Sequence, residues 1–175
     1  MRVLGIDPGT IRMGVAVVDS EGSRTQCVTY ESVQVSKNLT LPDRLKEIHD
    51  SVRGFIERYT PDLLALENVF FDKDVRALVK IGEARASVML AAAEKKVPVV
   101  EYPPARVKQA ISGNGRASKV QVQQMVKHLF HLKTAPPSDA ADALAVALCH
   151  LQCQRGLRFL GRVSGREKNV RIPVG

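Results

Sequence analysis

Three short apolar segments fill the first 35 residues, and the turns between them are too short to contain a helix. The segments span residues 3–6, 13–18 and 26–35, and a Pro8-Gly9 turn follows the first. Strands joined so closely must pair in antiparallel fashion, because a parallel pair needs a crossover of a dozen or more residues. The chain is therefore predicted to begin as an antiparallel meander.

Helical and strand patterns alternate after residue 40. Helices are expected over residues 42–59, 74–96, 103–111, 118–129 and 138–154, and short strands over 63–66 and 97–101. Ser118 and Gln121 have the spacing of a capping box, which supports a helix start at that point. The order of elements predicts an α/β fold with a mixed five-stranded sheet flanked by helices.

The length of 175 residues suits one globular core. Residues 1–154 are expected to form a single domain, and residues 155–175, which hold six Lys or Arg and the single acid Glu167, a flexible basic tail. No stretch approaches the roughly 20 apolar residues of a membrane span. Three cysteines without secretory context predict reduced thiols, so we expect a soluble, cytoplasmic protein without a membrane partner.

Positive charge is concentrated toward the C-terminus. Residues 1–100 hold 14 Lys or Arg and 14 Asp or Glu, whereas residues 101–175 hold 12 and 4. A polyanion such as nucleic acid would bind such a segment by releasing condensed counterions. A basic surface kept for solubility would have the same composition.

Four carboxylates stand where predicted elements begin or end. Asp7 closes the first strand and Glu67 the strand after the first helix, while Asp139 and Asp142 share one face at the start of the last helix. Clustered carboxylates repel one another unless a cation lies between them, and Mg²⁺ prefers oxygen ligands. Taken singly, Asp139 can stabilise a helix N-terminus and Asp7 can cap a turn. Taken together, the four would suit a metal-dependent nuclease if the fold brings them together, since two ions can activate water and stabilise the leaving oxygen. Their spacing alone does not decide between this function and separate structural roles.

The sequence resembles the RuvC crossover-junction resolvases, which have a ribonuclease H-like fold. The resemblance covers about residues 2–152 and depends on five blocks: GIDPGT at 5–10 with Gly14, LALENVF at 64–70, GEAR at 82–85, EYPPARVKQAISGNGRASKVQV at 101–122 and SDAADALAVALCH at 138–150. It implies an endonuclease that resolves four-way (Holliday) junctions in recombination and repair, leaving 5′-phosphate and 3′-hydroxyl ends. Glu83 departs from the Gln that relatives often have.

The resemblance also implies residue roles. Asp7, Glu67, Asp139 and Asp142 would form the catalytic tetrad and bind Mg²⁺, or Mn²⁺, as two ions for each active site. Lys108 and Lys119 would contact DNA or support catalysis near the cut. Phe70 would stack on an opened base, a role that Phe71 could share or replace. Arg76 is a further candidate DNA contact.

The resemblance implies two protein partners. Two symmetric nicks call for a twofold homodimer, and the alanine-rich residues 74–96 are the candidate interface. A branch-migration motor would deliver the junction.

Two other functions stay open from the sequence. One is a compact ribonuclease H-like nuclease that processes ribosomal RNA precursors, although that family lacks the block at 108–122. The other is a junction-binding protein without catalytic activity. Actin-like kinases also use an Asp-x-Gly-Thr loop, but they need two such domains. Cys149, His150 and Cys153 lack the paired spacing of a zinc site and are interpreted as core or groove residues.

Overall fold

The computed structural model describes residues 1–68 and 75–163, and the backbone alone over 157–163. The strands are β1 (Arg2–Asp7), β2 (Arg12–Glu21), β3 (Arg24–Gln34), β4 (Leu63–Glu67) and β5 (Val99–Tyr102). The helices are α1 (Leu41–Tyr59), α2 (Val75–Glu94), α3 (Pro104–Ser112), α4 (Lys119–Leu129) and α5 (Ser138–Val163). No helix in these ranges is both long and apolar enough to cross a membrane.

The strands form one mixed five-stranded sheet in the order β3-β2-β1-β4-β5. β1, β2 and β3 pair in antiparallel fashion, which confirms the predicted meander. β4 then joins β1 in parallel, and β5 joins β4 in parallel, after the crossover helices α1 and α2. The predicted α/β class and mixed sheet are therefore confirmed, with β1 at the centre.

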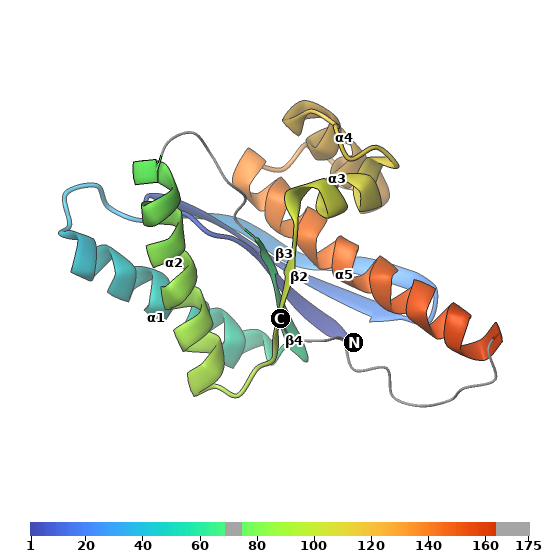
Figure 1. Cartoon of the computed structure of the whole chain (residues 1–175), viewed down its shortest axis with the longest axis horizontal. Helices are drawn as coiled ribbons and strands as arrows, with labels where there is room; N and C mark the ends of the chain where they lie inside the picture. Colours follow the sequence, from blue (N-terminus) through green and yellow to red (C-terminus); the bar gives the residue numbers. More distant parts are fainter. Residues whose placement is uncertain (69–74, 164–175) are drawn as a thin grey trace.

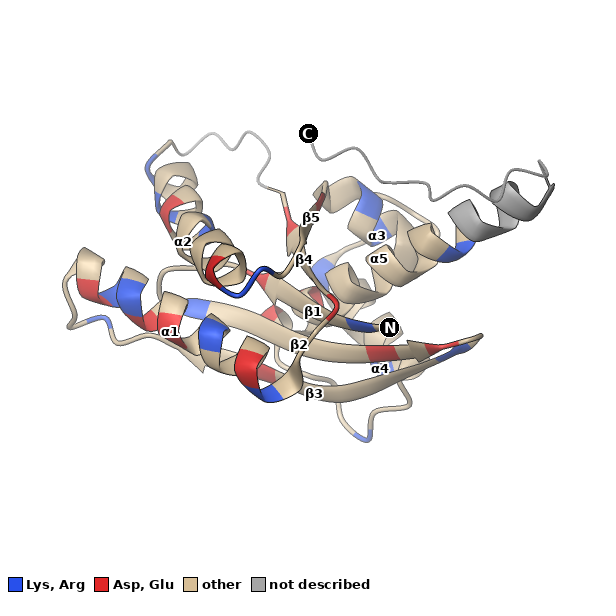
Figure 2. Ribbon diagram, turned by 90° about the horizontal axis from the view of Figure 1, so that it is seen from below, with Lys and Arg blue, Asp and Glu red and all other residues tan. Residues whose placement is uncertain are grey.

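Helices cover both faces of the sheet (Figure 1). α1 and α2 lie on one face, where Leu4 and Ile6 of β1 pack with Ile48 of α1 and Val88 of α2. α3, α4 and α5 lie on the other face, where Val3 of β1 joins the core made by α5. The view from below shows the same two layers (Figure 2). Successive side chains of β1 point to opposite faces of the sheet, and because helices cover both faces, both sets are buried.

Sequence signals place most helix ends correctly. Ser118 and Gln121 form the predicted capping box at the start of α4. α5 is longer than predicted, because it continues to Val163 rather than ending near Gln154. Gly156 costs a helix only about 1 kcal/mol, which is too little to stop one. Residues 164–175 lie outside the described residues, so the division into a domain and a basic tail stays a prediction.

The backbone of α5 lies directly against the backbones of β1 and β2, and two glycines make this close packing possible. A Cβ placed on Gly5 of β1 would lie 2.2 Å from the backbone oxygen of Ala143 in α5. A Cβ on Gly14 of β2 would lie 1.8 Å from the backbone oxygen of Asp139. No side chain larger than hydrogen fits at either position, so these glycines fix how closely the first turns of α5 approach the sheet.

We expect Gly14→Ala to push α5 away from β2. The added methyl group meets backbone atoms, which cannot rotate aside, so the free energy of unfolding should fall by about 3 kcal/mol or more. Chemical denaturation measures this change. Gly54→Ala on α1 is the control, because its Cβ would have no atom within 4 Å, and it should be neutral or slightly stabilising. Equal effects of the two substitutions would contradict the packing argument.

Candidate active site

Asp7 and Glu67 lie at the ends of adjacent parallel strands. β1 and β4 are paired so that Ile6 is opposite Leu66, and Asp7 and Glu67 follow directly. Parallel strands end at the same edge of a sheet, so both carboxylates emerge there. The structure thus brings together the first two predicted site residues.

Gly14 brings Asp139 to the same edge. Gly14 is the β2 partner of Asp7, and because it has no side chain, the Asp139 backbone in the first turn of α5 lies directly against it. Asp142 follows one turn later on the same helix face. The four carboxylates therefore converge from β1, β4 and α5, and the charges of Asp142, Glu67 and Asp139 each raise the pKa of Asp7.

Ser32 is a site residue that the sequence did not indicate. It is the β3 partner of Gly14, so Asp7, Gly14 and Ser32 form a row across three strands. The Ser32 hydroxyl donates a hydrogen bond of 3.2 Å to Oδ2 of Asp139. Only the register between β2 and β3 reveals this contact, and no motif marks it.

The cluster holds more negative charge than its surroundings favour. Burial, with the nearby Asp142 and Glu67 carboxylates, raises the pKa of Asp7 to about 8. Burial and Asp142 raise the pKa of Glu67 to about 7. Burial also raises the pKa of Asp142, although Lys119 opposes this shift. Near neutral pH the site therefore retains protons that a bound cation would displace.

Two lysines named in the sequence analysis, Lys119 and Lys108, border the carboxylates. Lys119, at the start of α4, places its Nζ 3.6 Å from Oδ2 of Asp142 while its side chain stays 75% exposed. Asp142 in turn raises the pKa of Lys119, so this side chain stays charged. Lys108 on α3 is close enough to lower the pKa of both Glu67 and Asp142. An incoming phosphate would meet positive charge beside the carboxylates.

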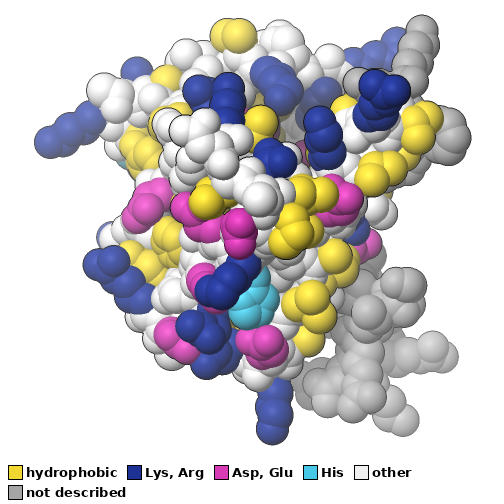
Figure 3. All heavy atoms as spheres, turned by 90° about the vertical axis from the view of Figure 1, so that its left-hand side faces the viewer, with side chains coloured by type: hydrophobic (Ala, Val, Ile, Leu, Met, Phe, Trp, Pro, Cys, Tyr) yellow, Lys and Arg dark blue, Asp and Glu magenta, His cyan; other side chains and the backbone are white. Residues whose placement is uncertain are grey.

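The other predicted DNA contacts are Arg76, Phe70 and Phe71. Arg76 lies exposed in the first turn of α2. Phe70 and Phe71 lie outside the described residues, so their roles stay predictions. On the face seen in Figure 3, Lys and Arg side chains gather in the upper part, on the side of α3 and α4.

Arg85 binds the backbone of one of the four carboxylate residues, Glu67. Its guanidinium, on α2, donates a hydrogen bond of 2.7 Å to the backbone oxygen of Glu67. It also pairs with the carboxylate of Glu101 on β5. The GEAR block marked Arg85 in the sequence but did not reveal what it contacts.

The cysteine and histidine group near the end of the match is core, as interpreted from the sequence. Cys149 and His150 are buried, and His150 Nδ1 lies 2.8 Å from the hydroxyl of Tyr102. Burial lowers the pKa of His150 to about 4, so the ring is neutral.

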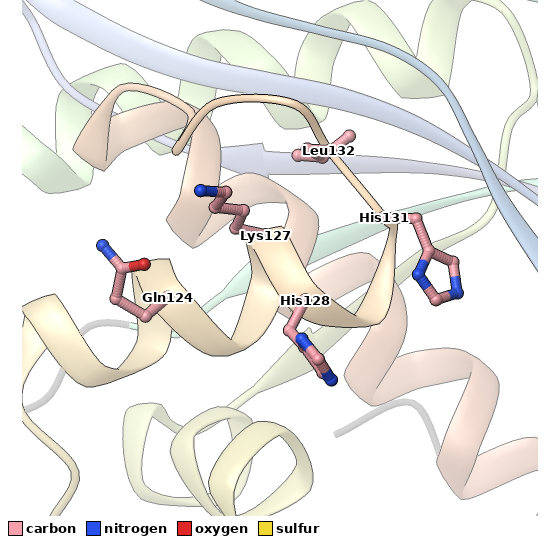
Figure 4. Close-up of a pocket in the computed structure, with 5 residues that line it drawn as sticks. All are labelled: Gln124, Lys127, His128, His131 and Leu132. Atoms are coloured by element: carbon pink, nitrogen blue, oxygen red, sulfur yellow. The ribbon is translucent and has the colours of Figure 1, made fainter.

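A polar pocket of about 320 Å³ lies at the end of α4, and none of the four carboxylates lines it (Figure 4). Its lining residues are Gln124, Lys127, His128, His131 and Leu132. The pocket lies at the carbonyl end of a helix, where the macrodipole opposes an anion. This geometry does not favour a phosphate site, despite the basic side chains.

The carboxylates have the donor chemistry of a hard divalent cation, since all four offer oxygen. Within residues 1–68 and 75–163, no three His, Cys, Asp or Glu side chains are yet arranged to hold a metal ion. Burial and repulsion between carboxylates raise the pKa of Asp7 and Glu67, and a bound cation would offset this repulsion.

The raised pKa values predict how stability depends on pH without metal. A carboxyl with a folded pKa above its unfolded value contributes stability at low pH, and this stability is lost as the pH rises to the folded pKa. For Asp7 the loss spans pH 3.8 to about 8. In EDTA above this range we expect Asp7→Asn to have a Tm about 2–4 °C above wild type.

Thermal melts in EDTA across this pH range measure the difference. Glu47→Gln on α1 is the control for removing a carboxylate outside the cluster. An Asp7→Asn protein less stable than wild type throughout would show that Asp7 is not under repulsion.

Comparisons with known proteins agree with this geometry. The family model for crossover junction endodeoxyribonuclease RuvC matches residues 3–150. The chain is 46% identical to that enzyme from Brevibacillus brevis, over 87% of this chain and 92% of the relative. It is 43% identical to the enzyme from Thermotoga maritima, over 90% of this chain and 95% of the relative.

Solved structures give the same result. Thermus thermophilus RuvC, in complex with a Holliday junction substrate, matches with a TM-score of 0.84 and 39% identity, over 89% of this chain and 96% of that chain. The yeast mitochondrial resolvase Ydc2 matches with a TM-score of 0.68 at 13% identity, which shows a shared fold. These neighbours confirm the ribonuclease H-like fold. The chain belongs to the RuvC family of crossover junction endodeoxyribonucleases.

Proposed function

We propose that this protein is a structure-selective DNA endonuclease that resolves four-way junctions by paired symmetric nicks, in recombination and repair. The observation that carries the proposal is the convergence of Asp7, Glu67, Asp139 and Asp142 at one edge of the sheet, with two lysines beside them. A relative of known structure holds a Holliday junction. Since the substrate is DNA, the proposed place of action is the cytoplasm.

Membership of this family implies dependence on a divalent metal. We propose Mg²⁺, with Mn²⁺ able to replace it, as two ions held by the four carboxylates. Bound there, the ions would supply an activated water and stabilise the oxygen that leaves. Attack by this water with the 3′ oxygen as the leaving group would give 5′-phosphate and 3′-hydroxyl ends.

The protein's own residues position the strand and balance its charge. Lys119 is long, mostly exposed and directed at Asp142, so it can exchange that carboxylate for a phosphate oxygen. Lys108 bears on Glu67 and Asp142 from α3 and can neutralise charge that develops near the cut. We propose Arg76, Phe70 and Phe71 as further DNA contacts, with Phe70 stacking on an opened base.

We propose a homodimer whose interface includes α2. Large apolar side chains stand exposed along this helix: Val75 is 66% exposed, Val79 54% and Leu90 61%. The small residues Gly82 and Ala86 are exposed between them and Ala93 after them, so a stripe at helical spacing runs the length of α2. A second copy would bury this stripe and present two active sites to the two equivalent strands of a junction. A branch-migration motor is the further partner that family membership suggests.

Cleavage of a synthetic mobile four-way junction tests the proposed reaction. With Mg²⁺ or Mn²⁺ we expect paired nicks at symmetric positions, no cutting in EDTA, and an Asp7→Asn rate on the order of 1% of wild type or less. A linear duplex of matched sequence and a structured RNA are the substrate controls. Tight junction binding without nicks would identify an inert binder, and preferential cutting of the RNA would identify an RNA-processing nuclease.

Charge placed on the α2 stripe should separate the proposed dimer. Leu90→Glu would bury a carboxylate at the interface, so we expect a monomer by light scattering and the loss of paired nicking. Leu129→Glu on α4 is the control, because Leu129 is also an exposed apolar residue, 40% accessible, but lies on another helix. A wild-type protein that is monomeric at micromolar concentration, or a dimeric Leu90→Glu variant, would refute this interface.

A further inference from the structure

We propose that Arg85 is a positioning residue for Glu67, and that it sets the metal affinity of the site without contacting metal or DNA. The inference rests on the proposed metal-dependent function. It concerns one guanidinium that joins α2, β4 and β5 directly behind the carboxylate cluster.

The contacts of Arg85 are specific and shielded. One nitrogen donates to the Glu67 backbone oxygen at 2.7 Å, and another pairs with the Glu101 carboxylate. The Arg85 side chain is only 12% exposed. A guanidinium is planar and permanently charged, so two donors held in a fixed fork restrict both partners at once.

The Glu67 backbone needs such a restraint because the strand ends there. The pairing between β1 and β4 ends at Ile6 with Leu66, so Glu67 has lost its neighbour on that side. On the other side, Glu67 is paired with Tyr102, and the Asn68 amide donates to the Tyr102 oxygen at 2.8 Å. Arg85 adds the hydrogen bond to the Glu67 oxygen, and its loss would leave this shielded carbonyl without that donor.

Repulsion in the cluster gives this restraint its function. Glu67 ends β4 at the sheet edge where Asp7 ends the adjacent strand β1, so like charge repels its carboxylate there, and without a fixed backbone it would move away. Metal ligands held by surrounding hydrogen bonds typically lose about 10–100-fold in affinity or activity when that support is removed. Arg85 also comes from α2, the proposed dimer helix, so the position of this helix bears directly on Glu67.

Arg2 provides a matched control. Its guanidinium also joins a carboxylate and a backbone oxygen, with bonds of 2.7 and 2.8 Å to Asp19 and 2.9 Å to the oxygen of Tyr59. It lies on β1 at the end opposite Asp7. Arg2→Met therefore removes the same type of interaction from a place remote from the cluster.

The test is a Mn²⁺ titration followed by electron paramagnetic resonance of the free ion, for wild type, Arg85→Met, Arg85→Lys and Arg2→Met. We expect Arg85→Met to weaken Mn²⁺ binding by about 10–100-fold. Arg85→Lys keeps the charge but not the fork, so its loss should be intermediate. Arg2→Met should lose thermal stability while its Mn²⁺ affinity stays within about twofold of wild type.

The metal requirement of junction cleavage at saturating DNA should rank the variants in the same order as their loss of Mn²⁺ affinity. The metal concentration for half-maximal rate should rise in Arg85→Met, while junction affinity measured in EDTA stays unchanged. If Arg85→Met does not fold, Arg85→Lys and Glu101→Gln carry the test, since each weakens the same pair and should shift the metal titration.

The outcomes separate this inference from the proposed function. A wild type without metal-dependent cleavage and without Mn²⁺ binding overturns both. A wild type that binds Mn²⁺ and cleaves, with unchanged Mn²⁺ affinity in the folded Arg85 variants, overturns the role of Arg85 alone. An equal loss of affinity in Arg2→Met would also overturn it, because the effect would then be general destabilisation.

Discussion

The close packing of α5 on β1 and β2 is the constraint on which the site depends. Because Gly5 and Gly14 lack side chains, backbone meets backbone, and the first turn of α5 lies over the end of β1. Asp139 and Asp142 are carried to Asp7 by this packing and not by any attraction between carboxylates. The hydrophobic cores on the two faces of the sheet provide the stability that offsets their repulsion.

The electrostatics of the site follow from this enforced proximity. Burial and mutual repulsion raise the pKa of Asp7 and Glu67 to about 8 and 7, so the protein without metal holds protons where a cation would bind. Lys119 on α4 and Lys108 on α3 offset part of the negative charge. Arg85 on α2 fixes the backbone of Glu67. Such a site gives up stability to keep four oxygen donors close together, which is the usual compromise in enzymes.

Much of this was predictable from the sequence, and the exceptions have physical causes. Short connections determined the antiparallel meander, and strand ends located Asp7 and Glu67, because both signals are local. The end of α5 was misplaced, since one glycine costs less than continued helix formation gains. The contact between Ser32 and Asp139 depends on strand register and joins residues 107 positions apart. The contact between Arg85 and Glu67 depends on helix packing and joins residues 18 positions apart. Neither contact leaves a local pattern in the sequence.

The central claim is that the carboxylates assembled by α5 packing form the metal centre. Anomalous diffraction from crystals soaked in Mn²⁺ would test it most directly. The account predicts manganese peaks bounded by Asp7, Glu67 and the first turn of α5, and no such peaks in Asp7→Asn. Peaks only elsewhere, such as at His128 and His131 in the α4 pocket, or an empty carboxylate cluster at saturating Mn²⁺, would contradict it.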